Sequence, residues 1–157
     1  MRETSALLAP AQVREWIVLE VGTIRCGIAI TQIQEMNKQI DMTPVHHAPA
    51  YVRGVINLRG QIVTAIDLRV KFGLPPLELD EDRCIVVVRW SGESIGLLAD
   101  RIQDIVVADA ADILDPPANI HGVTGAFFSG IYPTEQGLVA FMRLPELLTY
   151  DAPTRLS

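Results

Sequence analysis

The stretch GVINLRGQIVTAIDL, residues 54 to 68, holds two apolar segments separated by Arg59 and Gly60. Both segments contain several β-branched residues, whose side chains favour the extended strand conformation. Glycine at the break allows the backbone to turn, and Arg59 then stands at the end of the first segment. The stretch therefore predicts two short strands with a single positive charge at the turn between them.

Apolar segments of the same kind recur along the chain. The segments 15–21 and 24–30 flank a glycine turn, which predicts a β-hairpin. Residues 31–36 have room for one helical turn only. Further strand-like segments lie at 51–57, 61–66, 84–90, 94–99, 105–108 and 138–142. Short strands without a long amphipathic helix predict a mainly β protein built as barrels or a sandwich.

The sequence also contains a weak internal repeat. CGIAITQIQEM (26–36) aligns with IGLLADRIQDI (95–105) at an offset of 69 residues, and residues 54–68 align with GIYPTEQGLVAFMRL (130–144) at an offset of 76. The matched pieces follow in the same order, which predicts two similar small barrels. Their expected boundaries are 13–75 and 82–149, with a linker at 76–81, a flexible N-terminus at 1–12 and a C-terminal tail at 150–157.

Composition excludes several classes of protein. The 157-residue chain is 49% hydrophobic, and its formal net charge of −6 lacks the basic excess of a nucleic-acid-binding protein. Its apolar runs are far shorter than the roughly 20 residues of a membrane-spanning helix, and its N-terminal residues lack a signal-peptide core. We therefore expect a cytoplasmic protein that does not insert into the membrane. Cys26 and Cys84 lie in strand-like segments and are predicted to be buried, inert thiols.

Charge is distributed unevenly along the chain. Between residues 53 and 71 the charged residues are Arg53, Arg59, Arg69 and Lys71 against Asp67 alone. Residues 77–115 carry ten acidic residues against three arginines. Such a separation of charge can steer protein partners, although most of these side chains are expected to be ordinary solvated ones.

No pattern of residues points to catalysis or metal binding. His46 and His47 are adjacent, so in extended backbone their side chains point to opposite faces, and His121 stands beside a glycine in a predicted loop. The glycines between 122 and 130 lack the lysine and helix of a nucleotide site, and the acidic clusters lack the spacing of a calcium loop. We therefore predict a binding protein with no catalytic residues, no cofactor and no metal.

The sequence YVRGVINLRGQIVTAIDLRVKFGLP (51–75) closely resembles the CheW-like domain family, the coupling proteins of bacterial chemosensory systems. With the segments that precede and follow it, the resemblance covers residues 13–149. It implies two five-stranded SH3-like β-barrels packed together, with short helices. It also implies a stand-alone, non-catalytic protein that links the cytoplasmic tips of methyl-accepting chemoreceptors to the regulatory domain of a CheA-type histidine kinase, at membrane-associated receptor arrays.

The resemblance further implies a receptor-binding groove between the barrels, which maps onto Ile33, Glu35, Gly54 and Arg59 in this sequence. Val55 would add an apolar wall to a groove that takes a helix. Two roles stay open for Arg59: contact with the receptor, or bracing of the fold through backbone carbonyls. The alternative function is a small-ligand sensor that binds a metabolite between the barrels, which would require a sizeable polar pocket.

Overall fold

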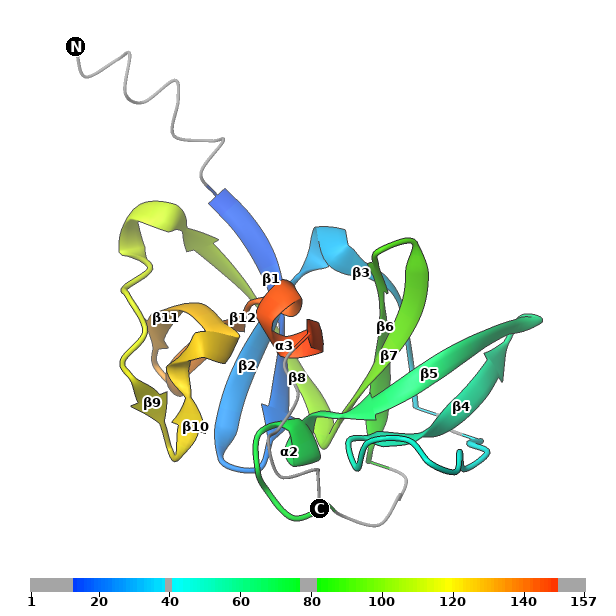
Figure 1. Cartoon of the computed structure of the whole chain (residues 1–157). Coiled ribbons are helices and arrows are strands. Elements are labelled where there is room, and N and C mark those ends of the chain that lie inside the picture. Colours follow the sequence, from blue (N-terminus) through cyan, green and yellow to red (C-terminus); the bar gives the residue numbers. More distant parts are fainter. Residues whose placement is uncertain (1–12, 39–40, 77–81, 150–157) are drawn as a thin grey trace.

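Figure 1 shows the chain as a computed structural model, in which strands β9 to β12 gather on one side and strands β3 to β7 on the other. The structure describes residues 13–38, 41–76 and 82–149. The expected N-terminus at 1–12 and tail at 150–157 lie outside these residues, as does most of the linker. Within the described ranges, no helix is long and apolar enough to span a membrane.

Two five-stranded sheets make up most of the fold. Sheet A has the strand order β11-β12-β2-β1-β8, and sheet B has the order β3-β6-β7-β5-β4. Sheet A consists of β1 (Val13–Val21), β2 (Ile24–Ala29), β8 (Arg101–Asp109), β11 (Phe128–Thr134) and β12 (Gly137–Met142). Sheet B consists of β3 (Ile33–Asn37), β4 (Val52–Leu58), β5 (Gln61–Asp67), β6 (Cys84–Trp90) and β7 (Glu93–Ala99).

The remaining elements are short. They are η2 (Ile30–Gln32), α2 (Leu68–Lys71), η3 (Ala110–Asp112), β9 (Asn119–Ile120), β10 (Val123–Thr124), η4 (Gly125–Phe127) and α3 (Leu144–Thr149). Strands β9 and β10 pair with each other as a separate hairpin. The predicted fold class is confirmed: the protein is mainly β, with two five-stranded sheets and a few short helices.

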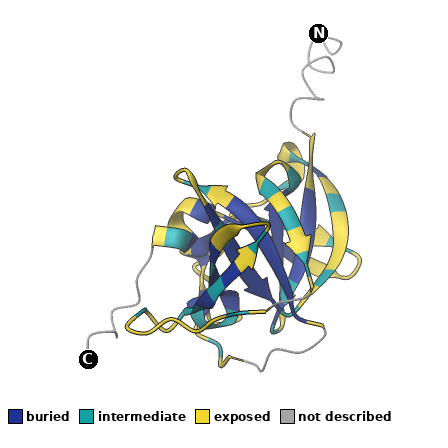
Figure 2. Ribbon diagram, turned by 90° about the vertical axis from the view of Figure 1, so that its right-hand side faces the viewer, coloured by how far each residue is buried: buried dark blue, intermediate teal, exposed yellow. Residues whose placement is uncertain are grey.

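Strand β6 shows how the two sheets share a core. Residues Cys84 to Val88 are apolar without alternation, and all are buried. Ile85 and Val87 pack among the inner residues of sheet B, whereas Val86 and its even-numbered neighbours pack in a core built from both sheets. A strand covered on both faces needs apolar side chains at every position. Figure 2 shows that the buried residues lie mainly in the inner strands, while turns and parts of other strands are exposed.

The two halves of the chain do not form one sheet each. The β1–β2 hairpin of the first half pairs with β8 and β12 of the second, and the β6–β7 hairpin pairs with β3 and β5 of the first. The expected division into barrels at 13–75 and 82–149 therefore differs from the sheets, each of which takes strands from both segments. The physical reason is the internal repeat. Because the β1–β2 and β6–β7 hairpins are alike, each can pair with the strands of the other half of the chain.

Two irregularities in the backbone pairing are separated by the same 69 residues as the repeat. In sheet B, the register shifts between Ile33 and Glu35 of β3, where β3 pairs with β6. In sheet A, the strand β8 skips a residue between Ile102 and Asp104, where it pairs with β1. The two irregularities fall at matching positions of the repeat, so the sequence alignment corresponds to a structural one.

A backbone bridge joins each sheet to the segment that follows its edge strand. Thr43, which follows β3, exchanges two hydrogen bonds of 2.8 and 2.9 Å with Val55 of β4. Leu114, which follows β8, exchanges two of 2.8 Å with Ile131 of β11. A Cβ atom on Gly54 would stand 2.4 Å from the carbonyl oxygen of Thr43. Position 54 therefore takes glycine because two backbones approach each other there.

Replacing Gly54 with Ala is expected to lower the free energy of unfolding by about 1–3 kcal/mol, because the added methyl group displaces the Thr43 carbonyl. Urea unfolding followed by tryptophan fluorescence measures the change. Gly73→Asn is a matched control, since no atom lies within 4 Å of a Cβ at that position and Asn tolerates its positive φ. If both variants lose the same free energy of unfolding, the contact between position 54 and the Thr43 carbonyl is not the reason for glycine there.

Both cysteines are buried in the shared core. Burial raises the pKa of the Cys84 thiol to about 11, although Arg83 acts in the opposite direction. Burial, and to a lesser extent the charge of Asp100, raises the pKa of Cys26 further. Because the thiolate is the reactive form, the folded protein holds both thiols in an unreactive state at neutral pH.

We expect the native protein at pH 8 to show no reaction with a disulfide reagent such as dithionitrobenzoate, since that pH lies well below the raised pKa values. In guanidinium chloride, both thiols become exposed and two equivalents per chain are expected to react. The release of thionitrobenzoate, followed by absorbance, measures the reaction. Rapid labelling of the native protein would contradict the burial of these side chains.

Candidate functional site

Arg59 stands at the tip of the β4–β5 hairpin. Leu58 pairs with Gln61, which leaves Arg59 and Gly60 as a two-residue turn, and these two have φ values of 54° and 83°. Positive φ at both positions is typical of the primed turn whose twist matches that of the flanking strands. The Asn57 side chain accepts a 2.9 Å hydrogen bond from the Gly60 N–H. The local sequence thus holds Arg59 at the end of a closed hairpin.

Arg59 forms an ion pair with Glu35 of β3. The Nη2 atom of Arg59 lies 3.0 Å from Oε1 of Glu35, and the two side chains are 85% and 22% exposed. An ion pair this open to water contributes only about 0–1 kcal/mol to stability. Among the described contacts, the partner of Arg59 is this carboxylate and not a backbone carbonyl. Arg59 is thus joined to a side chain of β3, and its contact with a receptor stays a prediction.

The ion pair borders a small opening at the end of sheet B. The opening has a volume of about 170 Å³ and is lined by residues of β3, β4, β5 and β6 together with the β4–β5 turn. Beside it, Ser94 donates a 2.7 Å hydrogen bond to Gln34 and accepts one of 3.2 Å from Gln61. Since small-molecule sites usually measure about 300–1,000 Å³, this opening is too small for a typical metabolite.

The other predicted site residues lie apart from the ion pair. Ile33 is half-buried against the shared core, close to Glu35 on β3. Gly54 and Val55 lie toward the other end of β4, at the bridge that joins β4 to the segment after β3. The structure therefore brings Glu35 and Arg59 into contact, and it places Gly54 and Val55 at a different point of sheet B.

An exposed apolar face lies beside the turn, and only one of its members, Val55, was among the predicted site residues. Ile62 is 61% exposed. Val55, Thr64 and Ile95 are half-buried and share its face of sheet B, because Val55 pairs with Thr64 and Thr64 pairs with Ile95. We name these four residues the sheet B face. Residues of β5 are apolar on both faces, so alternation in the sequence could not show which face is exposed.

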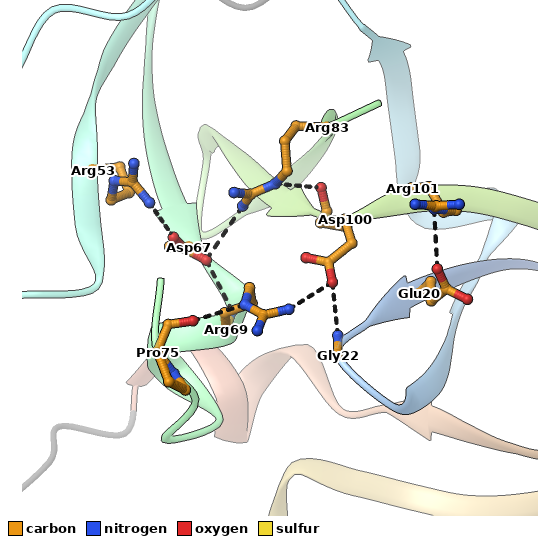
Figure 3. Close-up of polar contacts among 10 residues, drawn as sticks. Glu20, Gly22, Arg53, Asp67, Arg69, Pro75, Arg83, Asp100 and Arg101 are labelled. Carbon is orange, nitrogen blue, oxygen red and sulfur yellow. Dashed lines mark hydrogen bonds and ion pairs between the residues drawn. The ribbon is translucent and has the colours of Figure 1, made fainter. Parts of the chain in front are cut away.

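A buried ionic network holds the base of the same hairpin (Figure 3). The fully buried Asp67 carboxylate pairs with Arg53 at 2.5 Å and with Arg83 at 3.5 Å. It also accepts a 2.9 Å hydrogen bond from the backbone N–H of Arg69, which caps α2. The Arg69 side chain in turn pairs with Asp100 at 2.7 Å. The network therefore connects β4, β5 and α2 to the start of β6 and the end of β7.

This network accounts for most of the basic residues between positions 53 and 71. The Arg53 and Arg69 side chains are ion-paired and only 25% and 13% exposed. Lys71 is buried, with its Nζ atom 4.0 Å from the centre of the Tyr51 ring. Of the basic residues between positions 53 and 71, Arg59 is the one whose side chain is mostly exposed. Arg59 is therefore the positive charge that this segment presents to solvent.

The remaining candidates carry no chemistry of their own. His46, His47 and His121 are exposed in turns, and the last two have positive φ. In the part of the chain that the structure describes, no group of three or more His, Cys, Asp or Glu residues could hold a metal ion.

Asp67→Ala is expected to lower the free energy of unfolding by about 3–5 kcal/mol, because it removes a buried carboxylate that pairs with Arg53 and Arg83 and caps α2. Arg59→Ala is expected to lower it by less than about 1 kcal/mol, because the ion pair with Glu35 is exposed to water. Urea unfolding at pH 7 measures both. Equal losses in the two variants would contradict the division between a structural network and an exposed recognition residue.

The chain is similar in sequence to known proteins over most of its length. A family model described as the CheW-like domain matches residues 15–152. Chemotaxis protein CheW of Helicobacter pylori is 33% identical over 140 residues, which cover 89% of this chain and 84% of that protein. Chemotaxis protein CheW of Klebsiella aerogenes is 26% identical over 138 residues, which cover 88% of this chain and 83% of that protein.

A solved structure agrees with the fold. The crystal structure of the scaffolding protein TtCheW from Thermoanaerobacter tengcongensis superimposes with a TM-score of 0.80 at 27% identity, over 88% of this chain and 94% of that chain. The range matched by the family model includes both sheets, the Arg59 hairpin and the Asp67 network. The chain belongs to the CheW-like domain family.

Proposed function

We propose that this protein is a non-catalytic coupling protein that binds the cytoplasmic tips of methyl-accepting chemoreceptors and the regulatory domain of a CheA-type histidine kinase. Its relatives are named chemotaxis proteins, and a structural neighbour is named a scaffolding protein. It acts in the cytoplasm, at receptor arrays. The observation that carries the proposal is the exposed guanidinium of Arg59 at the β4–β5 turn, together with the exposed Ile62 of the sheet B face, which follows this turn on β5.

The chemistry of this surface suits a helical receptor tip. An apolar face of a helix gains stability by covering apolar side chains such as Ile62 and Val55. A carboxylate on the same helix gains a charge-assisted hydrogen bond from Arg59. The arginine sits on a closed two-residue turn, so little conformational freedom of its backbone is lost on binding. Apolar contact supplies affinity, and Arg59 selects the orientation of the helix.

The kinase domain is proposed to bind elsewhere on the chain. A coupling protein must hold the receptor and the kinase at the same time, so their two surfaces cannot overlap. Sheet A offers exposed apolar side chains of its own on β8, Ile105 and Val107, each more than half exposed. The two sheets therefore provide separate surfaces for two partners.

The alternative function, a sensor that binds a metabolite between the sheets, has no support in the packing. Such a sensor requires a polar pocket between the sheets. That space is filled by apolar side chains of the shared core, among them Leu19, Val86 and Leu97, none of which is exposed. The filled core favours a scaffold.

Arg59→Glu is expected to weaken binding to the receptor tip by about ten-fold or more, because it reverses the charge that faces a receptor carboxylate. Binding to the kinase regulatory domain is expected to persist. Biolayer interferometry with the receptor tip and the kinase domain encoded in the same genome measures both affinities. Far-UV circular dichroism establishes that the variant is folded.

Arg101→Glu is the matched control. Arg101 lies on β8 of sheet A, its side chain is 54% exposed, and it pairs with Glu20 at 3.0 Å, so like Arg59 it is an exposed arginine paired with a carboxylate. This variant is expected to leave receptor binding unchanged. If the two variants weaken receptor binding equally, net charge and not the Arg59 surface is responsible, and the proposed site is wrong.

A further inference from the structure

Sheet A has a face that corresponds residue by residue to the sheet B face. The offset of 76 relates Val55, Ile62 and Thr64 to Ile131, Leu138 and Ala140. The pairing repeats as well: Ile131 pairs with Ala140 as Val55 pairs with Thr64, and Ala140 lies beside Cys26 as Thr64 lies beside Ile95. We name Ile131, Leu138, Ala140 and Cys26 the sheet A face. The fold therefore contains two apolar faces of the same design.

A hairpin without counterpart in the first half lies next to the sheet A face. The chain from Leu114 to Ile131 is five residues longer than the matching chain from Thr43 to Val55. The longer connection contains β9 and β10, joined by a two-residue turn at His121 and Gly122. The β9–β10 hairpin is thus an insertion into one copy of the repeat.

This hairpin covers part of the sheet A face, since Ala140 is buried while Leu138 stays 51% exposed. Ile120 and His121 line one side of a pocket of about 260 Å³, and residues of the sheet A face line the other. Ala140 and Cys26 are only 2% and 0% exposed, whereas their counterparts on sheet B are half-buried. The cover is anchored at β10, where Val123 is buried in the shared core. It leaves unfilled apolar space beneath β9.

The charge at one of two matching positions near the faces is reversed as well. At the β11–β12 turn, the offset of 76 places Glu135 at the position of Arg59. On β8, the offset of 69 places Asp104 at the position of Glu35. The ion pair of sheet B thus has two acidic residues as its counterpart in sheet A. A receptor carboxylate that Arg59 attracts would be repelled at Glu135.

We propose that the sheet A face is a second, latent binding face for the receptor tip, and that the β9–β10 hairpin and Glu135 keep the receptor from it. The inference rests on the proposed function, because the occupant is the same receptor tip that binds the sheet B face. The hairpin acts as a built-in cover, and Glu135 repels the acidic side of the ligand. Each chain therefore binds its receptor through one face, although the fold supplies two.

The test first weakens receptor binding at the sheet B face by mutation and then asks whether uncovering the sheet A face restores it. Ile62→Glu places a charge on the sheet B face and is expected to weaken binding of a purified receptor cytoplasmic fragment by about ten-fold or more. In this background, residues 115–126 are replaced by residues 44–50, their shorter counterpart, and Glu135→Arg is added. Binding is expected to return to within a few-fold of the original affinity. Adding Leu138→Glu is then expected to abolish it again.

Each outcome has one meaning. If the original protein does not bind the receptor fragment, the proposed function is wrong. If it binds, but the folded exchange variant stays as weak as Ile62→Glu alone, the latent face is wrong and the proposed function stands. If circular dichroism shows that the exchange variant is unfolded, Ile120→Asp with Glu135→Arg replaces it in the Ile62→Glu background. This pair loosens β9 while Val123 still anchors β10. Restored binding then supports the latent face, and binding as weak as that of Ile62→Glu alone contradicts it.

Discussion

The exchange of hairpins between the two halves of the chain is the constraint on which the rest of the structure depends. Each half supplies a hairpin to the sheet of the other half, so neither half holds a complete sheet. A separated half would expose unpaired strand edges, which folded proteins avoid. Because the exchanged hairpins lie between the two sets of strands, their side chains also build the shared core. The two sheets therefore form one cooperative unit.

Buried and exposed charges have different roles in this unit. The Asp67 carboxylate lies among Arg53, Arg83 and the N-terminus of α2, where its loss would remove a charged partner from the buried Arg83. Arg59 pairs with Glu35 at the surface, where water weakens the interaction. The first arrangement fixes the base of the β4–β5 hairpin, and the second leaves its tip available to a partner. Stability and recognition are thus assigned to opposite ends of one hairpin.

The internal repeat supplies two similar faces. The charge at the adjacent turn and an added hairpin make them different. Backbone pairing is the same at Val55 and at Ile131, since each exchanges two hydrogen bonds with the segment after an edge strand. The side chains at the adjacent turns carry opposite charge, and one copy has an added hairpin. Binding specificity in such a fold comes from these differences and not from the backbone that both halves share.

The sequence did not predict β11, and most of the segment 31–36, which was expected to form one helical turn, is strand β3. By itself it determined most of the other strands, the turn at Arg59 and Gly60, the matching of the repeats and the resemblance to the CheW-like family. These features depend on local alternation, turn chemistry and residue order. It could not determine which hairpin joins which sheet, because two similar hairpins fit equally well by local criteria. Nor could it show that Arg53, Arg69 and Lys71 are partly or fully buried while Ile62 is exposed. Only the tertiary structure decided these points, because burial depends on contacts between residues far apart in the chain.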